Sequence, residues 1–181
     1  MKKRLLSLVI CMVFVLAMAG CGGSKTISGS SKAAEGSGAA GGSSAAASGD
    51  YAFKTKNVTV TINAEAKDII DKLGNPLSKY ESPSCAFGDL DVIYTYAGFE
   101  VYTYQEKKVD YIKEVTLKDD SVKTAEGVAI GDKTEKVEST YGKPDEKTDT
   151  KITYKRDKMN LVFILKSGVV EEIQYLNVRT K

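Results

Sequence analysis

The order of apolar and polar positions divides the 181-residue chain into three parts. An apolar run occupies residues 5–19, where only Ser7 is polar, whereas residues 22–50 are mostly Gly, Ser and Ala with isolated charges. From residue 51 onward, apolar residues recur at the spacings of short helices and strands. We therefore expect a targeting segment at 1–20, an unfolded tether at 21–50 and a folded domain at 51–181.

Two short helices are predicted in the domain, one in each half. The first has an apolar stripe at spacings of three, four and seven residues: Ala66, Ile69, Ile70 and Leu73. We expect Asn63 to cap this helix and Gly74 to end it. The second places three residues on one face, namely Thr134, Val137 and Tyr141. Asp132 and Glu135 have the spacing of a capping box, and Gly142 follows the last turn.

Strands are predicted after each helix. Their apolar and aromatic segments are residues 92–96, 99–104, 111–117, 151–154, 159–165 and 170–178. Ala97-Gly98 and Ser167-Gly168 are candidates for tight turns between neighbouring strands. The alternation of Val58, Val60 and Ile62 adds a possible strand before the first helix.

The two halves of the domain resemble each other in sequence. Five residues match five others at an offset of 68: Ile62, Ile69, Leu73, Gly74 and Pro76 against Ile130, Val137, Tyr141, Gly142 and Pro144. Three more match at an offset of 61: Val109, Ile112 and Val115 against Val170, Ile173 and Leu176. We therefore predict an α+β domain of two tandem helix-plus-antiparallel-sheet repeats, at about 56–117 and 121–178, with helices packed on one face of the sheet.

The N-terminal segment has the features of an export signal. Three basic residues, 2–4, precede the apolar run, which at 15 residues is shorter than a membrane-spanning helix. The run ends in Met18-Ala19-Gly20-Cys21, which resembles the lipobox of bacterial lipoproteins. That resemblance implies cleavage before Cys21 and a diacylglyceryl group on its thiol. Alternatively, the small-x-small pattern at residues 17–19 predicts ordinary cleavage and a soluble protein that starts at Gly20.

Charge and cysteine content change once the signal is removed. The full chain carries 26 basic and 24 acidic residues, and losing three basic ones leaves a net charge of −1. We therefore expect no nucleic-acid partner. Of the three cysteines, Cys11 leaves with the signal and Cys21 carries lipid, so Cys85 stands alone and no internal disulfide is expected.

A resemblance to a known family is clearer in the second half of the domain than in the first. It is carried by Gly127-Val-Ala-Ile-Gly-Asp132, a short helix, Tyr141-Gly-Lys-Pro144, Leu161-x-Phe163 and Gly168-Val-Val-x-x-Ile173. This pattern resembles the repeat of the beta-lactamase-inhibitor-protein-like fold, shared with SmpA/OmlA (BamE-like) lipoproteins, and covers about 56–178. The resemblance implies tandem helix-plus-sheet units whose sheets bind another protein. The repeat disulfides of the inhibitor have no counterpart here, and lactamase inhibition is not predicted.

Tyrosines are concentrated in the first-half strands, and we take five as a candidate binding surface: Tyr94, Tyr96, Tyr102, Tyr104 and Tyr111. Strand alternation predicts one face for Phe99, Val101 and Thr103 and the opposite face for Glu100, Tyr102 and Tyr104. Tyrosine offers a large contact area with a polar tip, which suits recognition. The alternative is that these are ordinary half-buried strand residues.

Catalytic candidates are weak. The chain has no histidine, which removes Ser/His and Cys/His mechanisms and the commonest metal ligand. Cys85 is therefore predicted to be a structural thiol. Asp89 and Asp91 are more typical of the flank of a turn than of a calcium site, and Asp119-Asp120 is predicted to be the turn between the halves.

These features together predict a non-enzymatic lipoprotein, without cofactor or metal, anchored on the extracytoplasmic face of the cell membrane. Its expected role is binding of an extracytoplasmic protein through the tyrosine-rich strands. The alternative is recognition of a cell-wall glycan or a small ligand, since tyrosine rows also stack on sugars.

Overall fold

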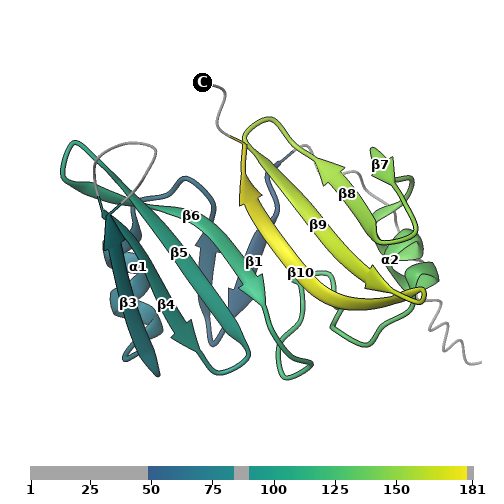
Figure 1. Ribbon diagram of the computed structural model, residues 1–181, viewed down its shortest axis with the longest axis horizontal. Coiled ribbons are helices and arrows are strands. Elements are labelled where there is room, and N and C mark those ends of the chain that lie inside the picture. Colours follow the sequence, from purple (N-terminus) through teal and green to yellow (C-terminus); the bar gives the residue numbers. More distant parts are fainter. Residues whose placement is uncertain (1–48, 84–89, 179–181) are drawn as a thin grey trace, which may run out of the picture. The chain divides into compact units, whose positions relative to one another are not determined.

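The computed structural model describes residues 49–83 and 90–178, all within one compact unit, Ala40–Lys181. In this part of the chain there are ten strands and two helices (Figure 1). In chain order they are β1 (Ala52–Thr55), β2 (Val58–Thr61), α1 (Ala66–Leu73), β3 (Ser78–Pro83), β4 (Leu90–Tyr96), β5 (Phe99–Glu106), β6 (Val109–Leu117), α2 (Thr134–Tyr141), β7 (Glu146–Lys147), β8 (Lys151–Lys155), β9 (Met159–Lys166) and β10 (Val169–Asn177).

Eight of the strands form one antiparallel sheet, in the order β3-β4-β5-β6-β10-β9-β8-β7. The two central strands, β6 and β10, pair directly, with Leu117 opposite Ile173 and Val115 opposite Tyr175. Their hydrogen bonds join the strands of the first half to those of the second (Figure 1). β1 and β2 form a separate two-stranded antiparallel hairpin.

The predicted fold class is wrong. The described residues are mainly antiparallel β-structure in one continuous eight-stranded sheet, not two helix-plus-sheet repeats with helices packed on a sheet. Each helix has eight residues and fully buries one of them, Ala66 in α1 and Val137 in α2. Helices of about two turns cover little of a sheet this wide, and the β1–β2 hairpin supplies the larger buried side chains, such as Phe53.

The helix positions were predicted correctly, but their caps were not. Glycine follows each helix, and Gly74 and Gly142 both have φ of +80°. The residues that precede the helices, Glu65 and Lys133, make no side-chain cap hydrogen bond. The predicted cap Asn63 instead donates its amide to the Lys158 carbonyl at 3.2 Å.

The predicted capping box at α2 is also absent. Asp132 accepts a hydrogen bond from the Ala129 N–H at 2.8 Å. The same carboxylate pairs with Lys136 Nζ at 2.6 Å. Asp132 therefore stabilises the loop before α2 and does not cap the first turn of the helix.

The apolar strands and their turns were predicted well. β4, β5, β6, β8, β9 and β10 each overlap a predicted segment, and β2 confirms the alternation of Val58 and Val60. Both glycines of the predicted turns have positive φ, +82° at Gly98 and +77° at Gly168. Three strands, β1, β3 and β7, were not predicted. β3, with the sequence SKYESP, lacks the apolar alternation that signals a half-buried strand.

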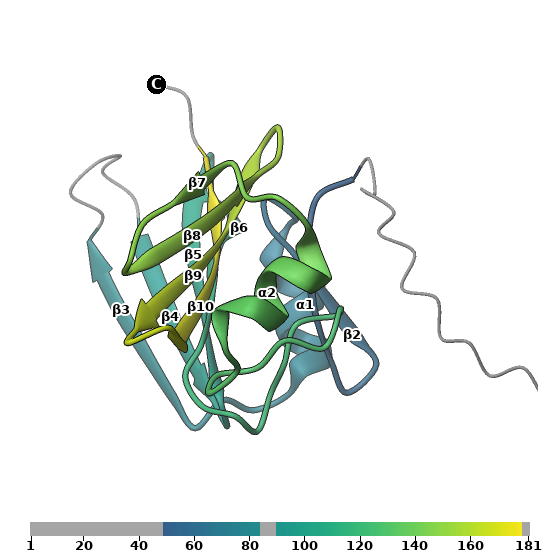
Figure 2. The same cartoon turned by 90° about the vertical axis from the view of Figure 1, so that its right-hand side faces the viewer.

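The hydrophobic core lies against one face of the eight-stranded sheet. Alternate residues of the central strands enter it fully buried, among them Val101, Ile112, Val115, Leu117, Leu161, Phe163 and Ile173. The hairpin adds Phe53, whose ring lies 4.9 Å from that of Phe99. In Figure 2 the hairpin strand β2 and both helices lie on the same side of the large sheet. The opposite face, which we call the outer face, is the one that positions the candidate site.

Candidate functional site

The outer face is identified by strand alternation and cross-strand register. In β5, Phe99 and Val101 enter the core, so Glu100 and Tyr102 point the other way. Residues opposite each other on neighbouring strands share a face. The register of the four neighbouring strands β4, β5, β6 and β10 therefore places eight residues on the outer face: Ile93, Thr95, Glu100, Tyr102, Glu114, Thr116, Gln174 and Leu176.

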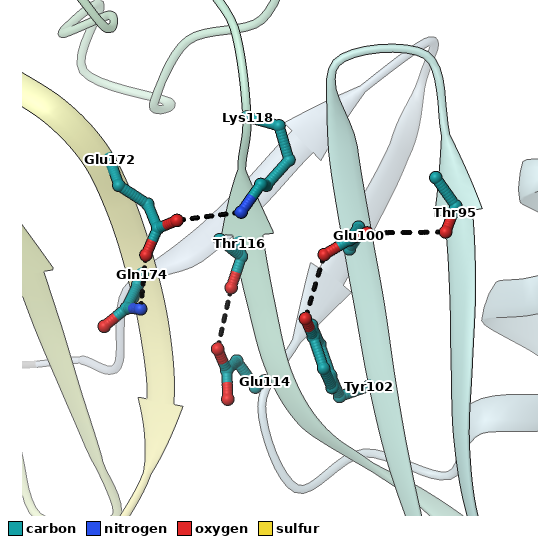
Figure 3. Close-up of polar contacts among 8 residues, drawn as sticks. All are labelled: Thr95, Glu100, Tyr102, Glu114, Thr116, Lys118, Glu172 and Gln174. Atoms are coloured by element: carbon teal, nitrogen blue, oxygen red, sulfur yellow. Dashed lines mark hydrogen bonds and ion pairs between the residues drawn. The ribbon is translucent and has the colours of Figure 1, made fainter. Parts of the chain in front are cut away.

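Three groups of hydrogen-bonded polar side chains lie on neighbouring strands of this face, and we call them together the acidic line: Thr95 with Glu100 and Tyr102, Glu114 with Thr116, and Lys118 with Glu172 and Gln174. The Tyr102 hydroxyl donates to Glu100 Oε2 at 2.8 Å, and the Thr95 hydroxyl donates to Glu100 Oε1 at 3.4 Å (Figure 3). Burial raises the pKa of Tyr102 well above its ordinary value, and the hydrogen bond to Glu100 adds to the effect. Tyr102 therefore stays protonated and remains a donor to the carboxylate.

The other two groups of the acidic line lie on β6 and β10, where the two halves of the sheet meet. On β6 the Thr116 hydroxyl donates to Glu114 at 2.7 Å. Glu172 of β10 accepts from Lys118 Nζ at 2.8 Å and from Gln174 Nε2 at 2.6 Å (Figure 3). The hydrogen bond to Glu172 raises the pKa of Lys118. These contacts restrict the orientations of the side chains that they join.

The line carries an excess of negative charge. Among the residues of the acidic line, Glu100, Glu114 and Glu172 carry carboxylates and Lys118 carries an ammonium group (Figure 3). Lys118 pairs with Glu172, while the hydrogen bonds shown to Glu100 and Glu114 come from hydroxyls. Neutral hydroxyl donors leave the carboxylate charge in place, so this part of the outer face complements a cationic group.

Apolar side chains flank the acidic line. Ile93 lies opposite Tyr102 on the neighbouring strand, and Leu176 lies opposite Glu114. Both are partly exposed. On the far side of Ile93, its β3 partner Tyr80 keeps 63% of its surface exposed. The outer face thus combines hydrogen-bonded carboxylates with partly exposed aromatic and aliphatic side chains.

Two of the five candidate tyrosines do not belong to this surface. Tyr94 and Tyr96 lie on the core side of the sheet. Tyr96 is a buried core residue, and Tyr94 is partly buried and packs against the core. The Tyr96 ring stacks on Phe99 with centroids 5.0 Å apart, and its hydroxyl donates to the Gly74 carbonyl at 3.4 Å. These two tyrosines serve packing, in agreement with the alternative interpretation of the sequence.

The other three candidate tyrosines lie on the outer face. Tyr104 and Tyr111 face each other on β5 and β6 and stack with centroids 5.5 Å apart. Tyr104 is only 7% exposed, whereas Tyr102 and Tyr111 are partly exposed. The candidate surface is therefore narrower than predicted and centres on Tyr102.

The acidic residues and Tyr80 were not predicted from the sequence. Alternation already paired Glu100 with Tyr102, but Glu114 and Glu172 join them only through the register of β5, β6 and β10. Register is not readable from one strand at a time. Tyr80 was overlooked because β3 itself was not predicted.

The other predicted residues contribute no catalytic arrangement. Cys21, Cys85 and Asp89 lie outside the described residues. Asp91 is on the outer face, with its carboxylate 3.4 Å from Lys113 Nζ. Asp119 accepts the backbone N–H of Ser121 at 2.9 Å, as expected of a turn. In the ranges 49–83 and 90–178, no group of three His, Cys, Asp or Glu residues could hold a metal ion.

Comparison with known proteins gives few matches. No family model and no curated protein matches this chain. One similar solved structure is an extracellular protein containing a SCP domain from Bacillus anthracis str. Ames, with 16% identity and a TM-score of 0.39. The match spans 64% of this chain and 44% of that one, and a likeness this weak carries no argument. No helix among the described residues is long and apolar enough to cross a membrane.

Proposed function

We propose that this chain is a non-catalytic protein-binding module, held on the extracytoplasmic face of the cell membrane by lipid on Cys21. The outer face around Tyr102 is its binding surface. The proposed localisation rests on the export signal and the lipobox-like residues 18–21. The binding role rests on the geometry of the eight-stranded sheet.

One observation carries the binding role: Tyr102 is oriented on the outer face by its hydrogen bond to Glu100. Tyrosine is among the residues that dominate binding energy in protein interfaces. A side chain that is already ordered loses less entropy when a partner binds. Thr95 orders Glu100 in the same way, so this cluster is prepared for contact before binding.

The chemistry of the face indicates the chemistry of the partner. The carboxylates of Glu100 and Glu114 favour an arginine or lysine, while Ile93 and Leu176 favour apolar groups next to it. The partner is therefore a protein surface with one or two cationic side chains among apolar ones. Its binding should weaken as salt is added.

Stacking on a sugar requires an open aromatic face. The rings of Tyr104 and Tyr111 stack on each other, and Tyr104 is buried. A sugar that stacks on Tyr104 would therefore have to separate this pair, whereas Tyr80 and Tyr102 remain at least partly exposed. The carboxylates and apolar side chains next to Tyr102 support a protein partner over the glycan considered from the sequence.

A binding experiment with the full-length chain tests the proposal. Extracytoplasmic proteins retained on the immobilised chain are identified, and one is purified for titration. We expect Tyr102→Ala to weaken binding at least tenfold, as for an interface hot spot. Glu114→Gln should reduce the salt dependence of binding. The matched control is Glu171→Gln, an exposed residue paired with Lys166.

Three outcomes would contradict the proposal. The first is a saturable partner whose affinity is unchanged by both outer-face variants. The second is retention on purified wall material with no protein partner. The third is a hydrolytic activity that is lost on Cys85→Ser.

The anchor needs its own test. Cys21→Ser should release the protein into the medium or leave its signal uncleaved, because the thiol that accepts the lipid is gone. If the variant is processed and still sediments with membranes, Cys21 is not the anchor.

A further inference from the structure

The two end strands of the large sheet differ in length. β7 has two residues, whereas β3 has six consecutive partners on β4 without a register shift. In the part of the chain that the structure describes, β3 pairs with β4 only, and Figure 1 shows no labelled element beyond it. Proteins shorten, cover or bend the edges of sheets, or place Lys and Pro on them, to prevent pairing with other chains. β3 carries Lys79 and Pro83, but it is neither short nor interrupted. A straight edge of this length is available for another strand.

Exposed apolar side chains gather along this edge. Five large apolar residues of the described ranges are exposed, and three of them lie here. Leu77, just before β3, is 75% exposed, Tyr80 on β3 is 63% exposed, and Leu90, which pairs with Pro83, is 40% exposed. Apolar surface concentrated at the open edge of a sheet is typical of an interaction site.

The sequence of the edge complements itself. Residues 77–83 read Leu-Ser-Lys-Tyr-Glu-Ser-Pro. When two copies run antiparallel with Tyr80 opposite Tyr80, every position meets a compatible one. Leu77 meets Pro83, Ser78 meets Ser82, and Lys79 meets Glu81. The pleat places Ser78, Tyr80 and Ser82 on the outer face and the charged residues on the other.

We propose that β3 pairs antiparallel with β3 of a second copy of this chain, about a twofold axis at Tyr80. The pairing extends the sheet without interruption from one copy into the next. Because residues opposite each other share a face, the outer faces of both copies lie on the same side. The partner at this edge is therefore the protein itself, while the outer face remains free.

The charges specify the register. Within one copy, Lys79 Nζ lies 2.5 Å from Glu81 Oε1, and both side chains are about half exposed. In the dimer each ammonium lies between its own Glu81 and that of the second copy, so the four charges alternate in sign. A shift of two residues one way places Lys79 opposite Lys79, and the other way places Glu81 opposite Glu81. Like charges opposite each other are unfavourable, and a shift of one residue reverses the faces.

Charge reversal tests this arrangement. Lys79→Glu alone leaves only carboxylates at the paired positions, and Glu81→Lys alone leaves only ammonium groups. Each variant of the full-length chain, purified in detergent, should self-associate roughly tenfold more weakly than wild type in sedimentation experiments. An equimolar mixture of the two should restore dimers, because each carboxylate then faces an ammonium. The double variant, Lys79→Glu with Glu81→Lys, should dimerise like wild type.

The mixing result is not expected from a purely local role of the Lys79–Glu81 pair, since mixing does not repair that pair within either variant. The proposal is overturned if wild type stays monomeric over the concentration series. It is also overturned if self-association is unchanged in both single variants, or if it falls in them and is not restored on mixing.

Disulfide trapping tests the twofold position independently of charge. In a Cys85→Ser background, Tyr80→Cys should give disulfide-linked dimers under mild oxidation, because the axis brings the two copies of this residue together. Ser78→Cys and Ser82→Cys are the matched controls, since each lies four residues from its own copy along the paired strand. Equal cross-linking at all three positions would contradict the register, and no dimer from Tyr80→Cys would contradict the pairing.

Discussion

Lys118 Nζ and Glu172 Oε2 form an ion pair at 2.8 Å across the boundary between β6 and β10, where the two halves of the sheet meet. The pair lies on the outer face, and its side chains are 45% and 27% exposed. On the opposite face of the same strands, Leu117 and Ile173 face each other fully buried. Apolar packing and the hydrogen bonds between β6 and β10 therefore hold the boundary, and the ion pair orients Glu172 on the outer face.

Substitutions on neighbouring residues of β6 should separate these two contributions. Lys118→Met is expected to lower the free energy of unfolding by no more than about 1 kcal/mol, because exposed ion pairs contribute little. Leu117→Ala should cost about 2–5 kcal/mol through lost burial and the cavity left behind. Urea unfolding of both variants, at low and high salt, measures the difference. A larger loss from Lys118→Met than from Leu117→Ala would contradict this account.

The two classes of tyrosine should respond differently to truncation. Tyr96→Ala removes a buried ring stacked on Phe99 and is expected to cost about 3–5 kcal/mol of stability. Tyr102→Ala removes a partly exposed ring and one hydrogen bond, so its loss of stability should be smaller. Thermal unfolding monitored by circular dichroism compares the two. The assignment of Tyr102 to the binding surface fails if its truncation unfolds the domain as readily as that of Tyr96.

Gly98 is the turn glycine with the least room. A Cβ at this position would clash with Ser121 Oγ and lie 2.9 Å from Asp119 Oδ1, and φ is +82°. Gly168 has a similar φ of +77°, but a Cβ there would meet no atom within 4 Å. Gly98→Ala should therefore destabilise the fold by more than the roughly 1 kcal/mol expected for positive φ alone, which is the cost expected for Gly168→Ala. Equal unfolding midpoints for the two variants would show that the loop at Ser121 moves to make room for the added Cβ without a loss of stability.

Asp132 should give the loop before α2 a pH-dependent stability. The hydrogen bond from Lys136 holds the pKa of this carboxyl below its ordinary 3.8. A lowered pKa in the folded state means that the contribution is complete above the unfolded value. It is lost as pH falls through the folded value. Asp132→Asn should therefore lower the free energy of unfolding by about 0.5–1.5 kcal/mol at neutral pH.

The loss caused by Asp132→Asn should shrink as the pH falls below 3.8. Urea titrations from neutral pH down to the lowest pH at which the fold persists measure this trend. The exposed Asp157→Asn is the control and should show no comparable change. A loss from Asp132→Asn that is constant over this range would mean that the charge of Asp132 does not stabilise the loop.

The family resemblance seen in the sequence stays a prediction, because no family model matches the chain. The repeat of sequence features did locate the helices. α1 begins at Ala66 and α2 at Thr134, which is the 68-residue offset found between the halves. It misled on fold class, since short helices at regular positions suggested two units where β6 and β10 form one sheet.

The sequence by itself determined the local features: the strands with apolar alternation, the turns at Gly98 and Gly168, and the glycine that ends each helix. Such features depend on residues a few positions apart, so periodicity and backbone preferences are sufficient to predict them. The edge strand β3 was not predicted, because an exposed strand has no apolar alternation that would indicate it.

Tertiary structure decided the site. Lys118 and Glu172 are 54 residues apart in the chain and meet only because β6 pairs with β10 in one register. The same pairing gathers Glu100, Glu114 and Glu172 on the outer face, while Tyr96 goes to the core. Strand order and register arise from the packing of the whole domain, and a shift of one residue would exchange the two faces. The sequence could therefore identify tyrosine-rich strands, but only the assembled sheet shows that Tyr102 lies on the outer face and Tyr96 in the core.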